Sequence, residues 1–237
     1  MALPRLNESP QYTMTIPSTG EEIKYRPFLV KEQKILLMAQ ESQDPKQIMT
    51  SLLTCIENCT QGLDVSNLAT FDADYMFSQI RSKSVGESTS LIGVCKECEH
   101  ENTLSIKLDT ISVEVNPEVS KDITLTPEIT LRMKYPSYND FVAAGVLKEE
   151  NSATEILLNT VIACMDSIMT QDDNILVKDE SKEEIEEFLS SLTSDQFDMV
   201  ADFVRSIPKM YHKEEYKCEE CGTDNELVLE GLSDFFS

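Results

Sequence analysis

Several residue types and signatures on which enzymes depend are scarce or missing in this chain of 237 residues. It has no tryptophan and only two histidines, His100 and His212. It also lacks a glycine-rich phosphate loop, a GxSxG elbow and an HExxH helix, which are common catalytic signatures. Its many carboxylates show no spacing that would separate a general acid from ordinary solvated acids. We therefore expect a protein that is not an enzyme and has no catalytic residues.

Long hydrophobic runs are missing as well. Short apolar stretches such as ILLM are flanked at once by Lys, Glu and Gln, and none approaches the roughly 20 residues of a membrane helix. The opening MALPRLNESPQ shows no basic stretch followed by an apolar run, which is the pattern of a secretory signal. We expect no membrane insertion, and we expect the protein to act in the cytosol or in a particle assembled there.

Basic residues are too few to balance the acidic ones. The chain carries 43 acidic and 20 basic residues, which gives a formal net charge of −23. So much negative charge repels a phosphate backbone along most of the surface, which argues against direct nucleic-acid binding. The densest acidic run, DESKEEIEE at 179–187, is typical of a solvated helix face.

Cysteine is the informative residue that is present. Four of the seven cysteines form two CxxC motifs, Cys95 with Cys98 and Cys218 with Cys221. In a reducing compartment such close pairs are typical of metal ligands rather than disulfides. Each CxxC turn can place two thiolates at neighbouring corners of a tetrahedron, and two turns complete the closed four-sulfur shell of structural zinc. We predict one structural zinc ion per chain.

Other interpretations of the cysteines remain open. Iron fits the same four-sulfur shell, and each pair could instead be a reduced or redox-active pair without metal. A thioredoxin-type pair should open a helix, whereas strand patterns follow Asn102 and Asn225 here. Cys55, Cys59 and Cys164 invite a second metal site, but they lie on apolar helix faces, and we expect them to pack in the core.

The first half of the chain, residues 1–115, has the pattern of an α+β unit. Alternating apolar residues on both sides of a Ser18-Thr19-Gly20 turn predict a β-hairpin. Helical periodicity then begins at Val30, after Asp44-Pro45 and near Asp72, so three helices are expected. Strand-forming residues flank the first CxxC motif and predict a strand, a metal-binding turn and a returning strand.

The second half, residues 116–237, repeats this order. ITLRMKYPSYNDF corresponds to IKYRPFLVKEQ, and TSDQFDMVADFVRSIP corresponds to FDADYMFSQIRSKS. Between them, Ser152 and Glu155 form a capping box that opens a helix over TEILLNTVIACMDSIM. We therefore predict an α+β protein built by tandem duplication, with a first repeat at 1–115 and a second at 116–237.

The two CxxC segments also align with each other. KCEECGTDNELVLEG matches VCKECEHENTLSIKL, with Asn225 in the place of Asn102. Gly222 follows the second motif, as is usual in a zinc turn, whereas Glu99 follows the first and departs from that pattern. Because the motifs lie about 120 residues apart, we predict that a single zinc site joins the two halves.

Two segments resemble a known family, the T4-type bacteriophage baseplate hub subunits and hub assembly proteins. They are TIPSTGEEIKYRPFLVKEQKILLMAQES and LTCIENCTQGLDVSNLATFDADYMFSQIRSKSVGES, and the resemblance covers at least residues 11–100. It implies a noncatalytic structural or assembly protein of the central hub of a contractile-tail baseplate. The implied partners are other hub, spike or tail-tube proteins, and the implied location is the virion tail baseplate or the host cytoplasm during assembly. The alternative function is a cytosolic zinc-stabilised adaptor or regulatory protein unrelated to phage.

Two segments are candidate contact surfaces for protein partners. Tyr25, Arg26 and Phe28 lie in one of the few basic, aromatic stretches of the chain, and such residue types are enriched at binding hot spots. Phe235 and Phe236 form the second candidate, beside the end of the chain. In the alternative interpretation, Tyr25 and Phe28 fill the local core at a strand end, and the terminal phenylalanines fold back onto the core.

Overall fold

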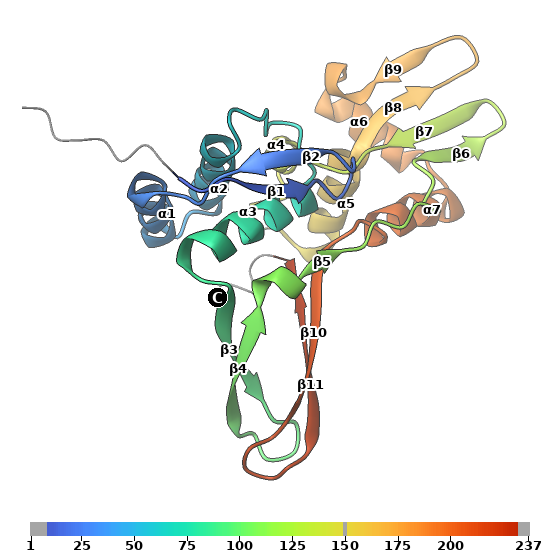
Figure 1. The fold of residues 1–237 in the computed structure, drawn as a ribbon. Helices are drawn as coiled ribbons and strands as arrows, with labels where there is room; N and C mark the ends of the chain where they lie inside the picture. The colour runs from blue at the N-terminus through green and yellow to red at the C-terminus, as the bar shows by residue number, and fades with distance from the viewer. Residues whose placement is uncertain (1–8, 149–150, 232–237) are drawn as a thin grey trace, which may run out of the picture. The chain divides into compact units, whose positions relative to one another are not determined.

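The structure is a computed structural model that describes residues 9–148 and 151–231. Helices and small antiparallel sheets alternate along the chain, so the predicted α+β class is confirmed (Figure 1). The chain divides into two compact units. Unit 1 comprises Met1–Val65, Phe71–Glu114 and Lys209–Ser237, and unit 2 comprises Ser66–Thr70 and Val115–Pro208.

These units differ from the predicted division into residues 1–115 and 116–237. The long central segment of unit 1 ends at Glu114, close to the expected boundary, but the segment Lys209–Ser237 groups with unit 1. Both CxxC motifs therefore belong to unit 1, and the larger segment of unit 2 lies between them in the sequence. The four cysteines bring together residues from the predicted halves 1–115 and 116–237, and both segments that carry them belong to one compact unit.

The helical part of unit 1 follows the predicted order. Strands β1 (Tyr12–Thr15) and β2 (Glu22–Tyr25) form the hairpin, and helices α1 (Val30–Ser42), α2 (Pro45–Cys59) and α3 (Thr70–Val85) follow. The Asp44 side chain accepts a hydrogen bond from the Lys46 amide at 2.9 Å, which caps α2, and a proline suits the first helical position. Helix α3 is the most deeply buried, and its enclosed apolar residues are Phe71, Ala73, Met76, Phe77 and Ile80.

Two β-hairpins complete unit 1. Strands β3 (Ser88–Val94) and β4 (Glu101–Lys107) flank the first CxxC motif, and β10 (Met210–Lys217) and β11 (Asp224–Glu230) flank the second. A short 3-10 helix (Leu108–Thr110) follows β4, and strand β5 (Ser112–Val113) pairs with β10. Side chains from both hairpins share one small core, formed by Leu91, Ile106, Leu108, Ile111, Met210 and Leu229. This core holds the two CxxC turns on the same side of the unit.

Unit 2 is a four-stranded antiparallel sheet with helices. The strand order is β6 (Asp122–Thr126), β7 (Ile129–Met133), β8 (Met165–Met169) and β9 (Asn174–Leu176). Its other elements are α4 (Tyr138–Ala144), α5 (Ala153–Cys164), a 3-10 helix (Val177–Asp179), α6 (Lys182–Ser190) and α7 (Ser194–Arg205). Buried residues of the sheet and of α5 and α7 form its core, including Leu131, Val161, Val200 and Phe203.

The predicted helix over TEILLNTVIACMDSIM was wrong in its second part. Helix α5 ends at Cys164, and the next five residues form strand β8. Asp166 and Ser167 are weak helix formers, and β8 gains backbone hydrogen bonds from β7 on one side and β9 on the other. The order of hairpin, helices and CxxC hairpin does recur in the second half, but β8 and β9 interrupt it, so the tandem duplication stays a prediction.

None of the helices in the described ranges is both long and apolar enough to cross a membrane.

Candidate metal centre

The two CxxC turns have the same backbone structure. In the first, the Cys95 amide donates to the His100 carbonyl at 2.9 Å, and the Glu99 amide donates to the Cys95 carbonyl at 3.0 Å. In the second, the Cys218 amide donates to the Thr223 carbonyl and the Gly222 amide to the Cys218 carbonyl, both at 2.9 Å. Each turn is thus closed at the mouth of its hairpin by an equivalent pair of hydrogen bonds.

The residue after each motif lies in the left-handed region of backbone space. Gly222 has a φ of 72°, and Glu99 has a φ of 58°. A glycine adopts this conformation without strain, whereas a residue with a Cβ atom does so at a cost. The first turn therefore departs from the glycine pattern in sequence and keeps the same geometry, with a strained glutamate.

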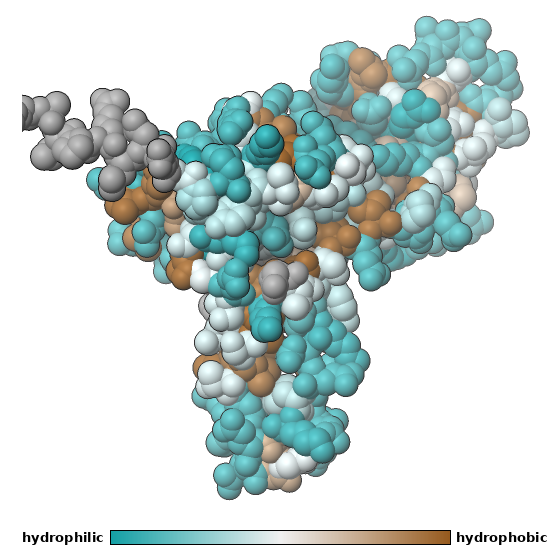
Figure 2. Space-filling model, viewed as in Figure 1, coloured by the Kyte–Doolittle hydropathy of each residue, from teal (hydrophilic) through white to brown (hydrophobic). Residues whose placement is uncertain are grey.

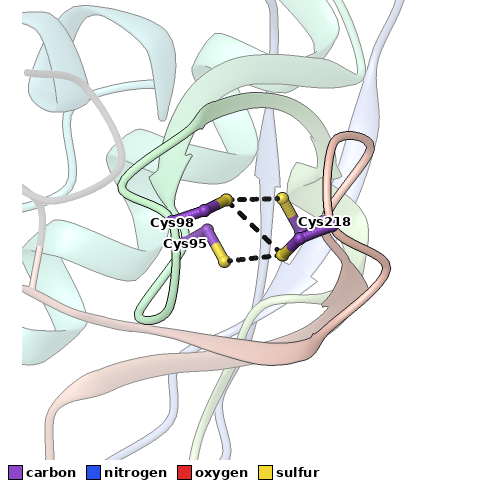
Figure 3. Close-up of side chains that lie close together, drawn as sticks. Cys95, Cys98 and Cys218 are labelled. Carbon is purple, nitrogen blue, oxygen red and sulfur yellow. Dashed lines mark hydrogen bonds between the residues drawn. The ribbon is translucent and has the colours of Figure 1, made fainter.

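The four motif cysteines lie together, as Figure 3 shows for the facing turns. Their sulfur atoms all lie within 4.8 Å of one another. The shortest separations are 3.4 Å between Cys98 and Cys221, and 3.6 Å for both Cys95–Cys221 and Cys98–Cys218. These cysteines are not disulfide-bonded. A tetrahedral zinc ion with Zn–S bonds of about 2.3 Å needs S···S edges of roughly 3.8 Å, so the cluster has the dimensions of a four-thiolate site.

The first cysteine of each motif is prepared to be a thiolate. Cys95 and Cys218 are buried, and backbone amides of their own turns point at their sulfur atoms. Hydrogen bonds from the Cys98 and Glu97 amides lower the pKa of Cys95 to about 6. The Cys221 amide is the main cause of the lowered pKa of Cys218. Hydrogen bonds to the charged form stabilise it, because the donors replace the lost water.

The pKa of Cys98 reflects the repulsion between neighbouring thiolates. The backbone amide of His100 lowers the pKa of Cys98, but the neighbouring sulfurs, led by Cys221, outweigh it and raise the pKa to about 12. Several thiolates at this distance repel one another, so they cannot all be charged unless a positive ion lies between them. A divalent metal supplies that charge, and its binding would release the remaining thiol protons.

Asn102 and Asn225 each donate a hydrogen bond to a CxxC cysteine of the opposite hairpin. The Asn102 side chain accepts from the Glu219 amide at 2.9 Å and donates to the Cys218 sulfur at 3.8 Å. The Asn225 side chain accepts from the Lys96 amide at 3.1 Å and donates to the Cys95 sulfur at 3.5 Å. Each also donates to a carbonyl at the mouth of its own turn, at His100 and Thr223 respectively.

Because each asparagine makes the same contacts with the opposite turn, the hydrogen bonds around the four sulfurs are nearly symmetric, as the ligands themselves are. Asn102 and Asn225 are both buried, and both have donors and acceptors satisfied by these contacts. Outer-shell hydrogen bonds of this kind orient the ligands of a metal and offset the negative charge of thiolates. The sequence alignment had matched the two asparagines but gave them no role, because their partners lie more than 110 residues away.

The other predicted sites have different surroundings. Cys55, Cys59 and Cys164 are buried in the core, as predicted, and burial raises the pKa of Cys164 to about 12. In the part of the chain that the structure describes, the four CxxC cysteines form the one group of cysteine, histidine or acidic residues positioned for a metal. His100 contributes its backbone to the first turn.

The predicted contact residues of the first hairpin have partners inside unit 1. Tyr25 is buried, and Phe28 is half-buried. The Arg26 guanidinium donates to Glu32 and to the Asn58 carbonyl, each at 2.9 Å, so it ties β2 to α1 and α2. These positions agree with the alternative interpretation, in which Tyr25 and Phe28 fill the local core. Phe235 and Phe236 lie outside the described residues.

Comparisons with known proteins cover nearly the whole chain. A family model described as T4 bacteriophage base plate protein matches residues 9–237. A protein of Enterobacteria phage T4, named baseplate hub assembly protein gp26, is 23% identical over 233 residues. That alignment covers 95% of this chain and 98% of the T4 protein. No solved structure gives a significant match.

Proposed function

Because the chain belongs to the family of T4 bacteriophage base plate proteins, we propose that it is a noncatalytic structural or assembly protein of the baseplate hub. The observation that carries this proposal is the family match over residues 9–237, together with an end-to-end similarity to a hub assembly protein. The absence of the usual catalytic signatures from the sequence is consistent with a role in protein contacts. We propose that its partners are other hub, spike or tail-tube proteins of a contractile tail.

We further propose that Cys95, Cys98, Cys218 and Cys221 hold one zinc ion with a structural role. Four thiolates leave no open coordination position, which is typical of structural rather than catalytic zinc. The close approach of the four sulfurs, and the backbone amides that lower the pKa of the buried Cys95 and Cys218, support this assignment. The ion would fix the hairpin β10–β11 to the hairpin β3–β4 and so stabilise unit 1.

The function can be tested in the phage that encodes this chain. A nonsense mutation in its gene should yield tails that lack complete baseplates, visible by electron microscopy, and expression of the chain in trans should restore them. Mass spectrometry of purified wild-type virions then separates a subunit, which remains in the particle, from an assembly factor, which departs. Normal baseplates and a normal yield of infectious particles without the chain would contradict the proposal.

A further inference from the structure

The two exposed cysteines of the candidate metal centre come from different hairpins. Cys98 lies in the turn after β3 and Cys221 in the turn after β10, and both are exposed. Cys95 and Cys218, by contrast, are only 1% and 3% exposed. Figure 2 shows a mainly hydrophilic surface around these turns, at the lower end of the view. A dissolved oxidant therefore meets Cys98 and Cys221 before it meets the two buried sulfurs.

The two exposed sulfurs are also close to each other. Cys98 Sγ and Cys221 Sγ lie 3.4 Å apart, and no disulfide joins them. A disulfide bond is about 2.05 Å long, so a small movement of the two turns brings the sulfurs into bonding distance. Every other pair among the four cysteines includes a buried one. Exposure and distance therefore select the same pair, and that pair connects the two hairpins.

We propose that Cys98 and Cys221 form a disulfide bond between the hairpins when the chain meets a peroxide, and that this bond replaces the metal. Cys95 and Cys218 alone cannot complete a four-sulfur site, so the ion leaves when the disulfide forms. This inference rests on the proposed metal centre, and it adds a second, covalent state of the same four cysteines. A particle released from a cell passes into an oxidising medium, in which disulfides persist.

The reaction is a two-electron oxidation of sulfur. One of the two thiolates attacks an oxygen of hydrogen peroxide, so that an S–O bond forms, the O–O bond breaks and hydroxide leaves. The other thiolate attacks the resulting sulfenic sulfur, so that the S–S bond forms, the S–O bond breaks and a second hydroxide leaves. The two sulfurs together lose two electrons, and the peroxide gains them. Zinc departs as Zn²⁺, because it has no redox chemistry of its own.

The new bond would close a long loop of the chain. Cys98 and Cys221 are 123 residues apart in the sequence, and a cross-link over so long a loop restricts the unfolded chain strongly. The bond would also hold together the two hairpins that share the small core around Met210. We expect the oxidised, metal-free chain to unfold at least about 5 °C above the reduced, metal-free chain.

The test uses the full chain, freed of metal by a chelator, reduced, and then treated with one equivalent of hydrogen peroxide. Trypsin and a glutamate-specific protease together separate all four cysteines, because lysine or glutamate stands between the cysteines of each motif, CKEC and CEEC. Mass spectrometry of the nonreduced peptides then identifies each disulfide. We expect the bond between Cys98 and Cys221 to be the main product.

Two variants form a matched pair for this test. Cys98→Ser removes an exposed sulfur and should abolish both the cross-link and the rise in unfolding temperature. Cys95→Ser removes a buried sulfur and should leave the bond between Cys98 and Cys221 in place. In the zinc-loaded wild type, a chromophoric chelator should record one zinc ion released for each disulfide formed, and reduction with dithiothreitol should restore zinc binding.

The outcomes separate the cross-link from the metal centre. If zinc binds but disulfides form mainly within the motifs, or sulfinic acids form without a cross-link, the metal centre stands and the proposed cross-link is wrong. If the cross-link forms while zinc stays bound, the disulfide does not replace the metal, and the proposal is overturned. If the reduced wild type binds no zinc at all, the proposed metal centre fails, and the replacement of a metal by a disulfide fails with it.

Discussion

At the scale of single residues, the candidate metal centre depends on side chains that act in matched pairs. Asn102 and Asn225 each donate a side-chain hydrogen bond to a buried cysteine of the opposite hairpin. Each also accepts a hydrogen bond from a backbone amide in the CxxC turn of that cysteine. A four-thiolate zinc site has a net charge of −2, and in a chain this acidic such donors offset part of the excess negative charge. The asparagines thus make the pairing of the hairpins and the binding of the metal interdependent.

Replacing either asparagine should weaken metal binding. We expect Asn102→Ala and Asn225→Ala each to lower the zinc affinity about 10- to 100-fold, as is usual for outer-shell partners of metal ligands. Competition with a chromophoric chelator measures this affinity. Asn116→Ala is the matched control, because Asn116 belongs to unit 2 and its exposed side chain accepts a hydrogen bond from the nearby Glu118 amide at 2.9 Å. Equal affinities for the control and the two variants would show that the asparagines do not support the ligands.

The buried ion pair of unit 1 predicts a dependence of stability on pH. Burial raises the pKa of Glu32, but hydrogen bonds from Arg26, the Leu29 amide and Lys31 outweigh burial and hold the pKa below its usual value. A carboxylate with a lowered folded-state pKa stabilises the fold above its unfolded pKa of about 4.3, and this contribution is lost as the pH falls through the folded value.

We therefore expect Glu32→Gln to lower the free energy of unfolding by about 3 kcal/mol at pH 7, because it leaves Arg26 without its charged partner. The difference from the wild type should shrink as the pH falls below about 4.3, because Glu32 then becomes protonated in the unfolded chain while the folded chain still holds it charged. Urea titrations at several pH values measure both quantities. A difference that stays constant down to pH 3 would contradict this account of the ion pair.

At the scale of elements, the two CxxC turns offer an internal comparison. Glu99 and Gly222 occupy equivalent positions with positive φ, and space around the Gly222 Cα is open. Glu99→Gly should therefore stabilise the chain by up to about 1 kcal/mol, and Gly222→Ala should destabilise it by a similar amount. Thermal unfolding of the zinc-loaded protein measures both changes. The same sign for both substitutions would show that the turns are not conformationally equivalent.

The hairpins also meet closely at Gly93 in β3. A Cβ atom added at this position would lie 2.8 Å from the Tyr216 hydroxyl oxygen and 2.9 Å from Leu104 Cδ1. The Tyr216 hydroxyl also donates to the Val94 carbonyl at 3.1 Å, so the tyrosine of β10 lies against β3.

We expect Gly93→Ala to cost about 1 to 3 kcal/mol of stability, as overpacking usually does. The control Ser90→Ala changes an exposed residue of the same strand and should have little effect. Combining Gly93→Ala with Tyr216→Ala should recover part of the loss, since the second change removes the ring that obstructs the methyl group. Unfolding in denaturant tests these values, and a neutral Gly93→Ala would contradict the close contact of the two hairpins.

Much of this architecture could be predicted from sequence where its signals are local. The hairpin around Gly20, the start of a helix at Asp44-Pro45 and the CxxC turns depend on neighbouring residues, and the structure has them where expected. The end of α5 at Cys164 could not be predicted, because strand β8 pairs with β9, which follows it closely, and also with β7, which lies before α4 and α5 in the chain. Ile48 illustrates the same limit: it fits the apolar period of α2, yet it is exposed, because the period does not reveal which turns of a helix reach the core.

In the candidate metal centre, too, the local features could be predicted from the sequence and the long-range contacts could not. The four ligands follow from two local motifs, whereas the exchange of Asn102 and Asn225 between hairpins follows from how the hairpins pack. The grouping of Lys209–Ser237 with unit 1 likewise depends on the pairing of β10 with β5 and on the shared core around Met210. The alignment of the two CxxC segments was the one signal that marked the asparagines.

At the scale of the whole molecule, unit 1 is built from segments that are far apart in the sequence. Cys98 and Cys218 are separated by 120 residues, yet their sulfur atoms lie 3.6 Å apart. The entropic cost of closing so long a loop rises only slowly with its length, and zinc binding can supply several kcal/mol against it. The metal would therefore add to the small hydrophobic core that holds the two hairpins of this discontinuous unit together.

Native mass spectrometry of the intact chain, purified under reducing conditions, tests this central claim most directly. We predict one zinc ion per chain in the wild type, and we predict its loss in the double variant Cys218→Ser and Cys221→Ser. A folded wild-type chain that carries fewer than about 0.5 zinc ions, with no iron in their place, would contradict the claim that the four cysteines form a metal centre.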